Sequence, residues 1–189
     1  MSTALTKAKL LEGKQLLESE RPEPQWWSGL ATKHVQYLRL IFTDTFDLID
    51  HPEFHAQGAE AKIFDELPPI EEPDTSWYRP VMEVPSSSTL RQASFLLLTT
   101  DQEQLLFKRF NYCRHRVWLL KADVLKLDKP SKKQKTSLLD WYERSEYYRH
   151  KIAKTNLALV LAMAKRARSM DMEFPELVSE GNMALLRAV

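Results

Sequence analysis

Apolar residues recur at helical spacing through the second half of the chain. The stretch LLTTDQEQLLFKRF contains two overlapping capping boxes, Thr99 with Gln102 and Thr100 with Glu103, which predict that a helix starts here. Apolar residues then follow at alternating steps of four and three along one seam: Leu106, Phe110, Cys113, Val117 and Leu120. A seam of this kind predicts that the helix packs against another helix.

Two further helices are expected after this one. Pro130 stands among lysines in LDKPSKKQK, which predicts a solvated loop, with phosphate contact as the second interpretation. A long helix is expected from about Ser137 to about Ser169, because apolar residues keep helical spacing throughout it. Pro175 suits the first position of a last helix, where its missing N–H costs nothing. That helix reaches Val189 without a stop signal, so the chain is expected to end within a helix.

The first half of the chain has a weaker pattern. Helices are expected over residues 5–20 and about 26–49, and residues 67–88, rich in proline and serine, predict an extended linker. We therefore expect an all-α fold, a helical bundle with a partly extended N-terminal extension. The expected divisions are a variable acidic helical extension over 1–66, a Pro/Ser-rich linker over 67–89 and a helical domain over 90–189.

Composition agrees with this fold class and excludes several others. The 189 residues include only four glycines against ten prolines, which favours helices with stiff connectors over glycine-turned hairpins. The single cysteine, Cys113, excludes an intrachain disulfide and fits a reducing compartment, so a cytoplasmic protein is expected. No run of about 18 apolar residues and no signal-peptide core occurs, so neither secretion nor a membrane span is expected.

The net charge of +1 conceals two different halves. Residues 1–90 carry 8 Lys and Arg against 15 Asp and Glu, whereas residues 91–189 carry 19 against 11. A basic half indicates a nucleic acid or another polyanion as partner, and an acidic half competes for that surface or keeps the protein soluble. The simpler alternative is uneven solvated charge.

Patterns that would indicate catalysis are weak. His51 and His55 have the i, i+4 spacing of a zinc pair, but Glu53 is misplaced for a zincin and Pro52 indicates a turn or helix start. Cys113 lies on the apolar seam and is interpreted as a small core residue. Neither a Gly-rich phosphate loop nor a serine elbow is present. We therefore expect a protein that is not an enzyme, with no catalytic residue, no metal site and no cofactor.

The segment KTNLALVLAMAKRARSMDMEFPELVSEGNMALLRAV resembles region 2.1 and the start of region 2.2 of primary-type bacterial sigma factors, the sigma-seventy family. The first helix of that pattern is matched by Asn156, Leu157, Leu159, Val160, Ala164, Lys165 and Arg166. The second is matched by Phe174, Glu176, Leu177, Glu180, Gly181, Asn182, Leu185, Arg187, Ala188 and Val189. LLTTDQEQLLFKRF is similar to the helix start of region 1.2, so the resemblance covers roughly residues 90–189.

The resemblance implies a sigma factor fragment that binds core RNA polymerase and takes part in promoter recognition and transcription initiation. It implies contact with the clamp coiled coil of the largest polymerase subunit through Glu176, Ser179, Glu180, Asn182, Leu186, Leu157 and Val160. It also implies contact with the non-template strand of promoter DNA through Arg91, Asn156 and Leu159. An anti-sigma factor is a further candidate partner. On the last helix, Leu177, Val178, Gly181, Leu185 and Ala188 are expected to face inward, with Gly181 allowing a close approach of the preceding helix.

Departures from the family pattern keep other interpretations open. TLRQASF lacks the usual glycine before LLT, Ala184 and Ser179 replace a common Gly and Gln, and the segments that melt and read promoter DNA are missing. One alternative is therefore a helical regulatory protein that keeps a sigma-like docking surface but does not initiate transcription. Another is non-specific DNA binding through the basic half. For Asn156, the alternative to forming part of a pocket for a DNA base is a side chain whose hydrogen bonds are all made within the helical bundle.

Overall fold

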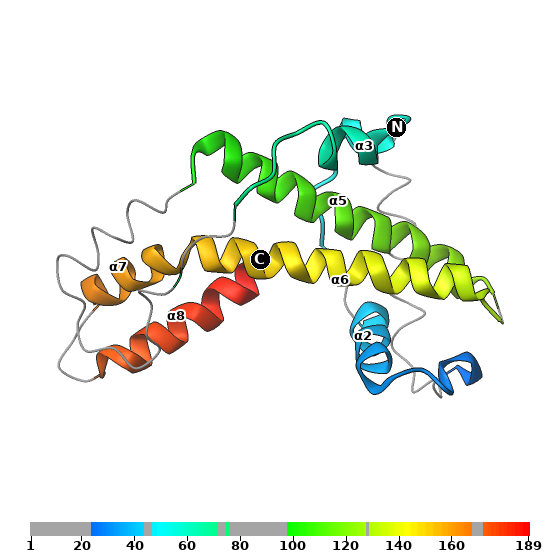
Figure 1. The fold of residues 1–189 in the computed structure, drawn as a ribbon. Coiled ribbons are helices and arrows are strands. Elements are labelled where there is room, and N and C mark those ends of the chain that lie inside the picture. Colours follow the sequence, from blue (N-terminus) through cyan, green and yellow to red (C-terminus); the bar gives the residue numbers. More distant parts are fainter. Residues whose placement is uncertain (1–23, 44–46, 72–74, 76–97, 128, 168–171) are drawn as a thin grey trace, which may run out of the picture. The chain divides into compact units, whose positions relative to one another are not determined.

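The computed structural model describes residues 24–43, 47–71, 75, 98–127, 129–167 and 172–189 (Figure 1). The helix predicted over 5–20, most of the predicted linker and Arg91 lie outside these residues. Within them the chain forms six α-helices and no strand, so the predicted all-α fold is confirmed. No described helix combines the length and the apolar character that a membrane span requires.

The chain divides into two compact units, each made of two separate stretches. The first unit is formed by Met1–Ala56 and Asn111–Ser145, and the second by Gln57–Phe110 and Glu146–Val189. Two long helices, α5 (Thr100–Leu125) and α6 (Lys132–Thr155), each supply residues to both units. The three divisions predicted from the sequence stay a prediction.

The prediction of a single helix over about 26–49 is wrong. The structure has a short 3₁₀ helix, η1 (Gln25–Trp27), and a separate helix α2 (Thr32–Thr43). Between them Gly29 has φ of +84°, a left-handed conformation that interrupts the helical ladder. α2 packs on α6 within the first unit through the rings of Tyr37 and Tyr142, whose centroids lie 5.0 Å apart, while Leu38 on its apolar face is fully buried.

α5 begins where the sequence predicts. Of the two predicted capping boxes, the one centred on Thr99 forms: Thr99 N donates to Gln102 Oε1 at 3.0 Å and Gln102 N donates to Thr99 Oγ1 at 3.3 Å. The first four residues of the predicted seam, Leu106 to Val117, are buried, and Leu120 is half-buried. Leu106 and Phe110 share a buried cluster with Ile152 of α6, so this part of the seam does face another helix.

The long helix predicted over about 137–169 is two helices, α6 and α7 (Leu157–Ala167). α6 begins earlier than predicted, because Ser131 and Gln134 form a capping box, so Lys132, Lys133 and Lys135 are helical rather than part of a loop. The helix is interrupted at Asn156. Its Nδ2 donates to Ile152 O at 2.9 Å, the acceptor that its own backbone N–H would use in a continuous helix. That N–H instead reaches Ala153 O at 3.1 Å.

In the second unit, a buried cluster of Ile70, Leu106, Phe110 and Ile152 joins α5 and α6 to the segment that follows α3 (Ala59–Phe64). Two buried cations hold this segment by its main-chain carbonyls. Arg109 donates to Ile63 O, Leu67 O and Pro68 O at 3.0, 3.0 and 3.1 Å. Lys151 donates to Ile70 O. The start of the predicted linker is therefore fixed in place rather than free.

Candidate functional site

The pair formed by α7 and α8 (Phe174–Ala188) lies within the second unit, and the two helices run side by side in roughly opposite directions (Figure 1). Their shared core consists of Val160, Leu161, Ala164, Phe174 and Val178, with Leu177 and Leu185 packed against it. α8 starts at Phe174, one residue before the predicted first position: Glu173 is its N-cap, and Pro175 stands in the first turn, where no hydrogen bond to its nitrogen is needed.

Gly181 is the point of closest contact between the two helices. A Cβ placed on Gly181 would lie 2.7 Å from Val160 Cγ1, nearer than real Cβ atoms come to any neighbour. The β-branched valine has few alternative rotamers in a helix, so it cannot easily turn away. The predicted role of Gly181 in letting the preceding helix approach closely is therefore confirmed.

The far end of α8 is also held. The guanidinium of Arg149, on α6, donates through Nη2 to the carbonyl of Leu186, which lies in the last turn of α8. A cation at this end is favourable to the helix dipole and satisfies a carbonyl that lacks a partner inside the helix. Arg149 Nη1 also lies 3.6 Å from Glu146 Oε2, which steadies the guanidinium. Both ends of α8 are thus positioned by the rest of its unit.

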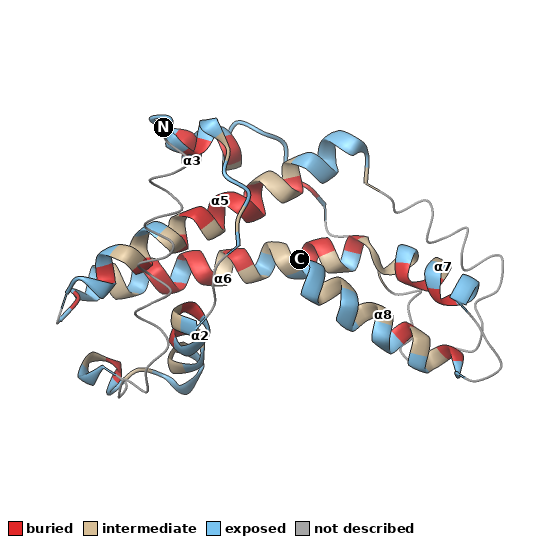
Figure 2. Ribbon diagram, turned by 180° about the vertical axis from the view of Figure 1, so that it is seen from behind, coloured by how far each residue is buried: buried red, intermediate tan, exposed pale blue. Residues whose placement is uncertain are grey.

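One face of α8 is exposed along two turns. Glu176, Ser179, Glu180 and Met183 follow the i, i+3, i+4, i+7 spacing and are all exposed; we call them the α8 ridge. Figure 2 shows that the buried residues of α8 are confined to its first half. Asn182 and Leu186, predicted to join this surface, are half-buried at its edge.

The set of inward-facing residues predicted for α8 is largely correct. Val178 is buried, whereas Leu177, Gly181 and Leu185 are half-buried and lie on the α7 side. Ala188 is exposed, so its predicted inward position is wrong. Ala188 is the last residue of α8 and lies beyond the end of the core that α7 and α8 share.

α7 contributes an apolar exposed surface. Leu159 is 51% exposed and Met163, one turn further, is 60% exposed. Asn156, just before α7, is half-buried, and its amide group donates to Ile152 O within its own turn, as the bundle alternative expected. Leu157 is half-buried, and Val160 is 6% exposed in the core against Gly181. Among the residues here that were predicted to contact a partner, Leu159 is therefore the most exposed.

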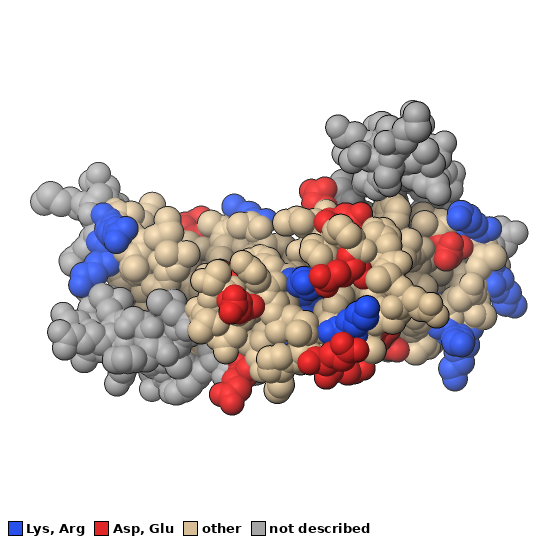
Figure 3. All heavy atoms as spheres, turned by 90° about the horizontal axis from the view of Figure 1, so that it is seen from above, with Lys and Arg blue, Asp and Glu red and all other residues tan. Residues whose placement is uncertain are grey.

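The charge of the ridge is acidic. Glu173, Glu176 and Glu180 are exposed along the first two turns of α8, while Lys165 and Arg166 are exposed in the last turn of α7. Carboxylates with a methionine among them suit a partner surface that offers arginine or lysine around an apolar centre. Elsewhere, on the face drawn in Figure 3, the visible Lys and Arg side chains are interspersed with acidic ones and do not merge into one broad basic patch.

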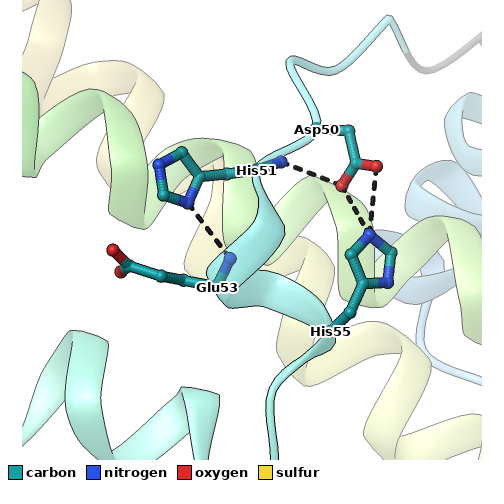
Figure 4. A network of polar contacts seen from close by, with 4 residues as sticks. All are labelled: Asp50, His51, Glu53 and His55. Carbon is teal, nitrogen blue, oxygen red and sulfur yellow. Dashed lines mark hydrogen bonds and ion pairs between the residues drawn. The ribbon is translucent and has the colours of Figure 1, made fainter.

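The two histidines singled out by spacing do not face one another. Pro52–His55 forms a 3₁₀ helix, η2, rather than an α-helix, and His51 caps it: its Nδ1 accepts from Glu53 N at 3.2 Å. Figure 4 shows the His51 ring turned away from His55, whose Nε2 lies 2.9 Å and 3.0 Å from the two oxygens of Asp50. Neither Asp50 nor His115 of α5, whose ring centroid lies 5.0 Å from that of His55, was predicted from the sequence.

His115 occupies an apolar environment in the first unit. Burial lowers the pKa of its imidazole from the ordinary value; the neighbouring His55 acts in the same direction and Asp50 in the opposite one. Cys113, two residues earlier, is buried on the same helix, as expected for a core residue.

Comparison with known proteins gives a short match. The chain is 43% identical over 47 residues to the RNA polymerase sigma factor SigA of Lactococcus lactis subsp. cremoris and, equally, to that of Lactococcus lactis subsp. lactis strain IL1403. The match covers 25% of this chain and only 13% and 12% of these two relatives. No protein-family model matches the chain, and no solved structure matches it. The similarity to a primary sigma factor is therefore partial and distant.

Proposed function

We propose that this protein binds core RNA polymerase through the α8 ridge and takes part in promoter recognition and transcription initiation as a sigma-type subunit. The proposed contact on the polymerase is the clamp coiled coil of its largest subunit. The observation that carries the proposal is the exposure of Glu176, Ser179 and Glu180 on one face of a helix whose other face is fixed against α7. The partial similarity to SigA supports the same assignment.

The rigidity of α8 supports a docking role. Binding costs less free energy when the contacting side chains already stand on a fixed element, because little conformational entropy is lost. Phe174 and Val178 anchor the start of α8 in the core, and the Arg149 guanidinium holds its end. Val160 would act in this role indirectly, by fixing the spacing of the two helices, and Leu157, Asn182 and Leu186 would contribute at the edge of the contact.

The proposed contact with the non-template promoter strand lies on α7 and just before it. Leu159 offers an exposed apolar side chain next to Asn156, whose amide can also hydrogen-bond a base. Arg91, the third proposed DNA contact, lies outside the described residues. A protein with these roles would act in the cytoplasm, and the same acidic ridge would be the surface for which an anti-sigma factor competes.

The docking proposal is tested by reversing charge on the ridge. The variant with Glu176→Lys and Glu180→Lys places two cations where a basic partner surface is expected, and like charges across an interface are strongly unfavourable. We expect its affinity for purified core polymerase to fall by about tenfold or more, because such repulsion exceeds about 1.4 kcal/mol. Affinity is measured by fluorescence anisotropy of the labelled chain titrated with core enzyme.

The matched control carries the same charge change elsewhere. Asp123→Lys with Asp140→Lys reverses two exposed carboxylates on α5 and α6 and should bind core enzyme as the unaltered chain does. Circular dichroism checks that both variants keep their helix content. Equal affinity of the ridge variant and the unaltered chain would show that α8 is not the docking surface.

The DNA contact has a separate test. Leu159→Ala should leave binding to core polymerase unchanged but weaken binding of a single-stranded non-template promoter oligonucleotide to the polymerase complex by about fivefold or more, the loss expected when one base contact is removed. Met163→Ala, at a position one turn further along α7 that is also exposed, is the control and should change little. Core binding without any promoter-strand binding in the unaltered chain would instead support the alternative of a regulator that does not initiate transcription.

A further inference from the structure

Three residues that are far apart in the sequence meet in the first unit. Asp50 lies two residues before η2, His55 is the last residue of η2, and His115 lies on α5, about 60 residues further along the chain. One potential ligand atom from each of them lies within 4.8 Å of the other two. Two imidazoles and one carboxylate converging from separate elements form the donor set of many metal centres.

The carboxylate of Asp50 is held in a defined orientation. Its Oδ1 accepts from His51 N at 2.9 Å, and both of its oxygens approach His55 Nε2, at 2.9 and 3.0 Å (Figure 4). η2 itself is fixed to α5 by Phe54, which is 6% exposed and meets the ring of Tyr112 at 5.4 Å. His55, at the end of η2, and Asp50, just before the N-cap of η2, are therefore kept close to α5 by this packing.

His115 supplies the buried side of the cluster. His115 is 4% exposed, and its ring centroid lies 5.7 Å from that of Phe54 and 6.4 Å from that of Trp118. Among the described residues, no group hydrogen-bonds to His115 Nδ1, although this atom is buried. A buried ring nitrogen without a partner is unfavourable and calls for a function that uses it, such as binding of an ion or a water molecule.

We propose that Asp50, His55 and His115 bind a divalent transition-metal ion, with Zn²⁺ the best fit. Imidazole nitrogens select such ions over Mg²⁺ and Ca²⁺, which prefer oxygen ligands alone. In a tetrahedral zinc site, bonds of about 2.0–2.1 Å place ligand atoms about 3.3 Å apart. His55 Nε2 lies 2.9 and 3.0 Å from the Asp50 oxygens, slightly closer than that spacing. The ligand atoms of all three residues lie within 4.8 Å of one another, so side-chain movement would bring them around one ion.

The open side of the site faces solvent. The side chains of His55 and Asp50 are 57% and 54% exposed, so the fourth ligand would be a water molecule or a group from a partner. The ion would link η2 to α5 and so stabilise the first unit. This proposal departs from the sequence-based expectation of no metal site, and it does not depend on the proposed polymerase binding.

The test uses the full chain after removal of any polyhistidine tag. Isothermal titration with Zn²⁺ alone should show one site per chain, and Co²⁺ should give the visible absorption of a four- or five-coordinate ion. Zn²⁺ at about 100 times its dissociation constant should raise Tm by roughly 5–10 °C. His55→Ala, at an exposed position, should weaken binding at least tenfold and abolish this shift; Asp50→Asn and His115→Gln should also weaken binding at least tenfold.

His51→Asn is the matched control, because asparagine retains an oxygen that can cap η2. It should bind Zn²⁺ within twofold of the unaltered chain. A triple variant combines Asp50→Asn, His55→Ala and His115→Gln. The proposal is overturned if the unaltered chain binds no more Zn²⁺ than this triple variant. It is equally overturned if His51→Asn loses as much affinity as His55→Ala, since the site would then be the histidine pair suggested by spacing. Circular dichroism confirms that each variant is folded, and His55→Ala alone decides the question if His115→Gln is not.

Discussion

Replacing Arg109 with methionine is expected to lower the free energy of unfolding by about 3 kcal/mol, since three buried or partly buried carbonyls lose their donor at once and each such loss costs about 1–3 kcal/mol. Methionine matches the length of the arginine stem, so packing is largely kept and the missing hydrogen bonds dominate. The carbonyls concerned belong to Ile63, Leu67 and Pro68. Urea denaturation followed by circular dichroism at 222 nm measures the change.

Two further variants separate the hydrogen bonds from the charge. Arg109→Lys keeps the charge but lacks the planar group that reaches several carbonyls together, so an intermediate loss of about 1–2 kcal/mol is expected. Lys165→Met makes a comparable change at an exposed position of α7 and should alter stability by less than about 0.5 kcal/mol. If Arg109→Met behaved like Lys165→Met, the guanidinium would not be what holds the segment from 63 to 68.

Gly181→Ala is expected to destabilise the chain by about 2 kcal/mol, as overpacking of a tight contact usually does. The sign is informative, because helix propensity alone would make alanine more stable than glycine by about 1 kcal/mol. The added methyl group would lie 2.7 Å from Val160 Cγ1, so α7 and α8 would have to separate. The same urea titration reports the loss.

A double variant tests the cause of that loss. Val160→Ala removes the opposing methyl group, so Gly181→Ala should cost less in its presence than alone, with a coupling of about 1 kcal/mol or more. Ser179→Ala, at an exposed position of the same helix, should stabilise slightly through propensity. Additive effects of the changes at 160 and 181 would show that the two helices do not meet through these residues.

The sequence predicted best the features that depend on neighbouring residues. The start of α5 was correct because Thr99 and Gln102 satisfy each other's amides over one turn. The break at Asn156 was not predictable from apolar spacing, since the apolar pattern continues through it and the interruption comes from one side-chain amide that takes a main-chain acceptor. The left-handed conformation of Gly29 was not predictable from apolar spacing either, because it depends on how the chain turns before α2.

The cluster of Asp50, His55 and His115, by contrast, depends on contacts that spacing in the sequence does not predict. Spacing of four residues pairs His51 with His55 only if both stand on an α-helix, and Pro52–His55 forms a 3₁₀ turn with a different side-chain period. The true neighbours of His55 are Asp50, through a local contact, and His115, through tertiary packing. No pattern in the sequence relates position 55 to position 115. On the last helix, by contrast, most of the residues that were predicted to face inward do so.

Arg109 and Lys151 hydrogen-bond to main-chain carbonyl oxygens in the segment from residue 63 to residue 70. These oxygens are present whatever side chain a residue carries. Leu67, three residues beyond the end of α3, is exposed, so its side chain can change during evolution while the path of the main chain stays constant. Homologous proteins could therefore share this crossing and show little identity across it. In proteins that share this architecture, the two cations should be conserved more strongly than the residues whose carbonyls they bind.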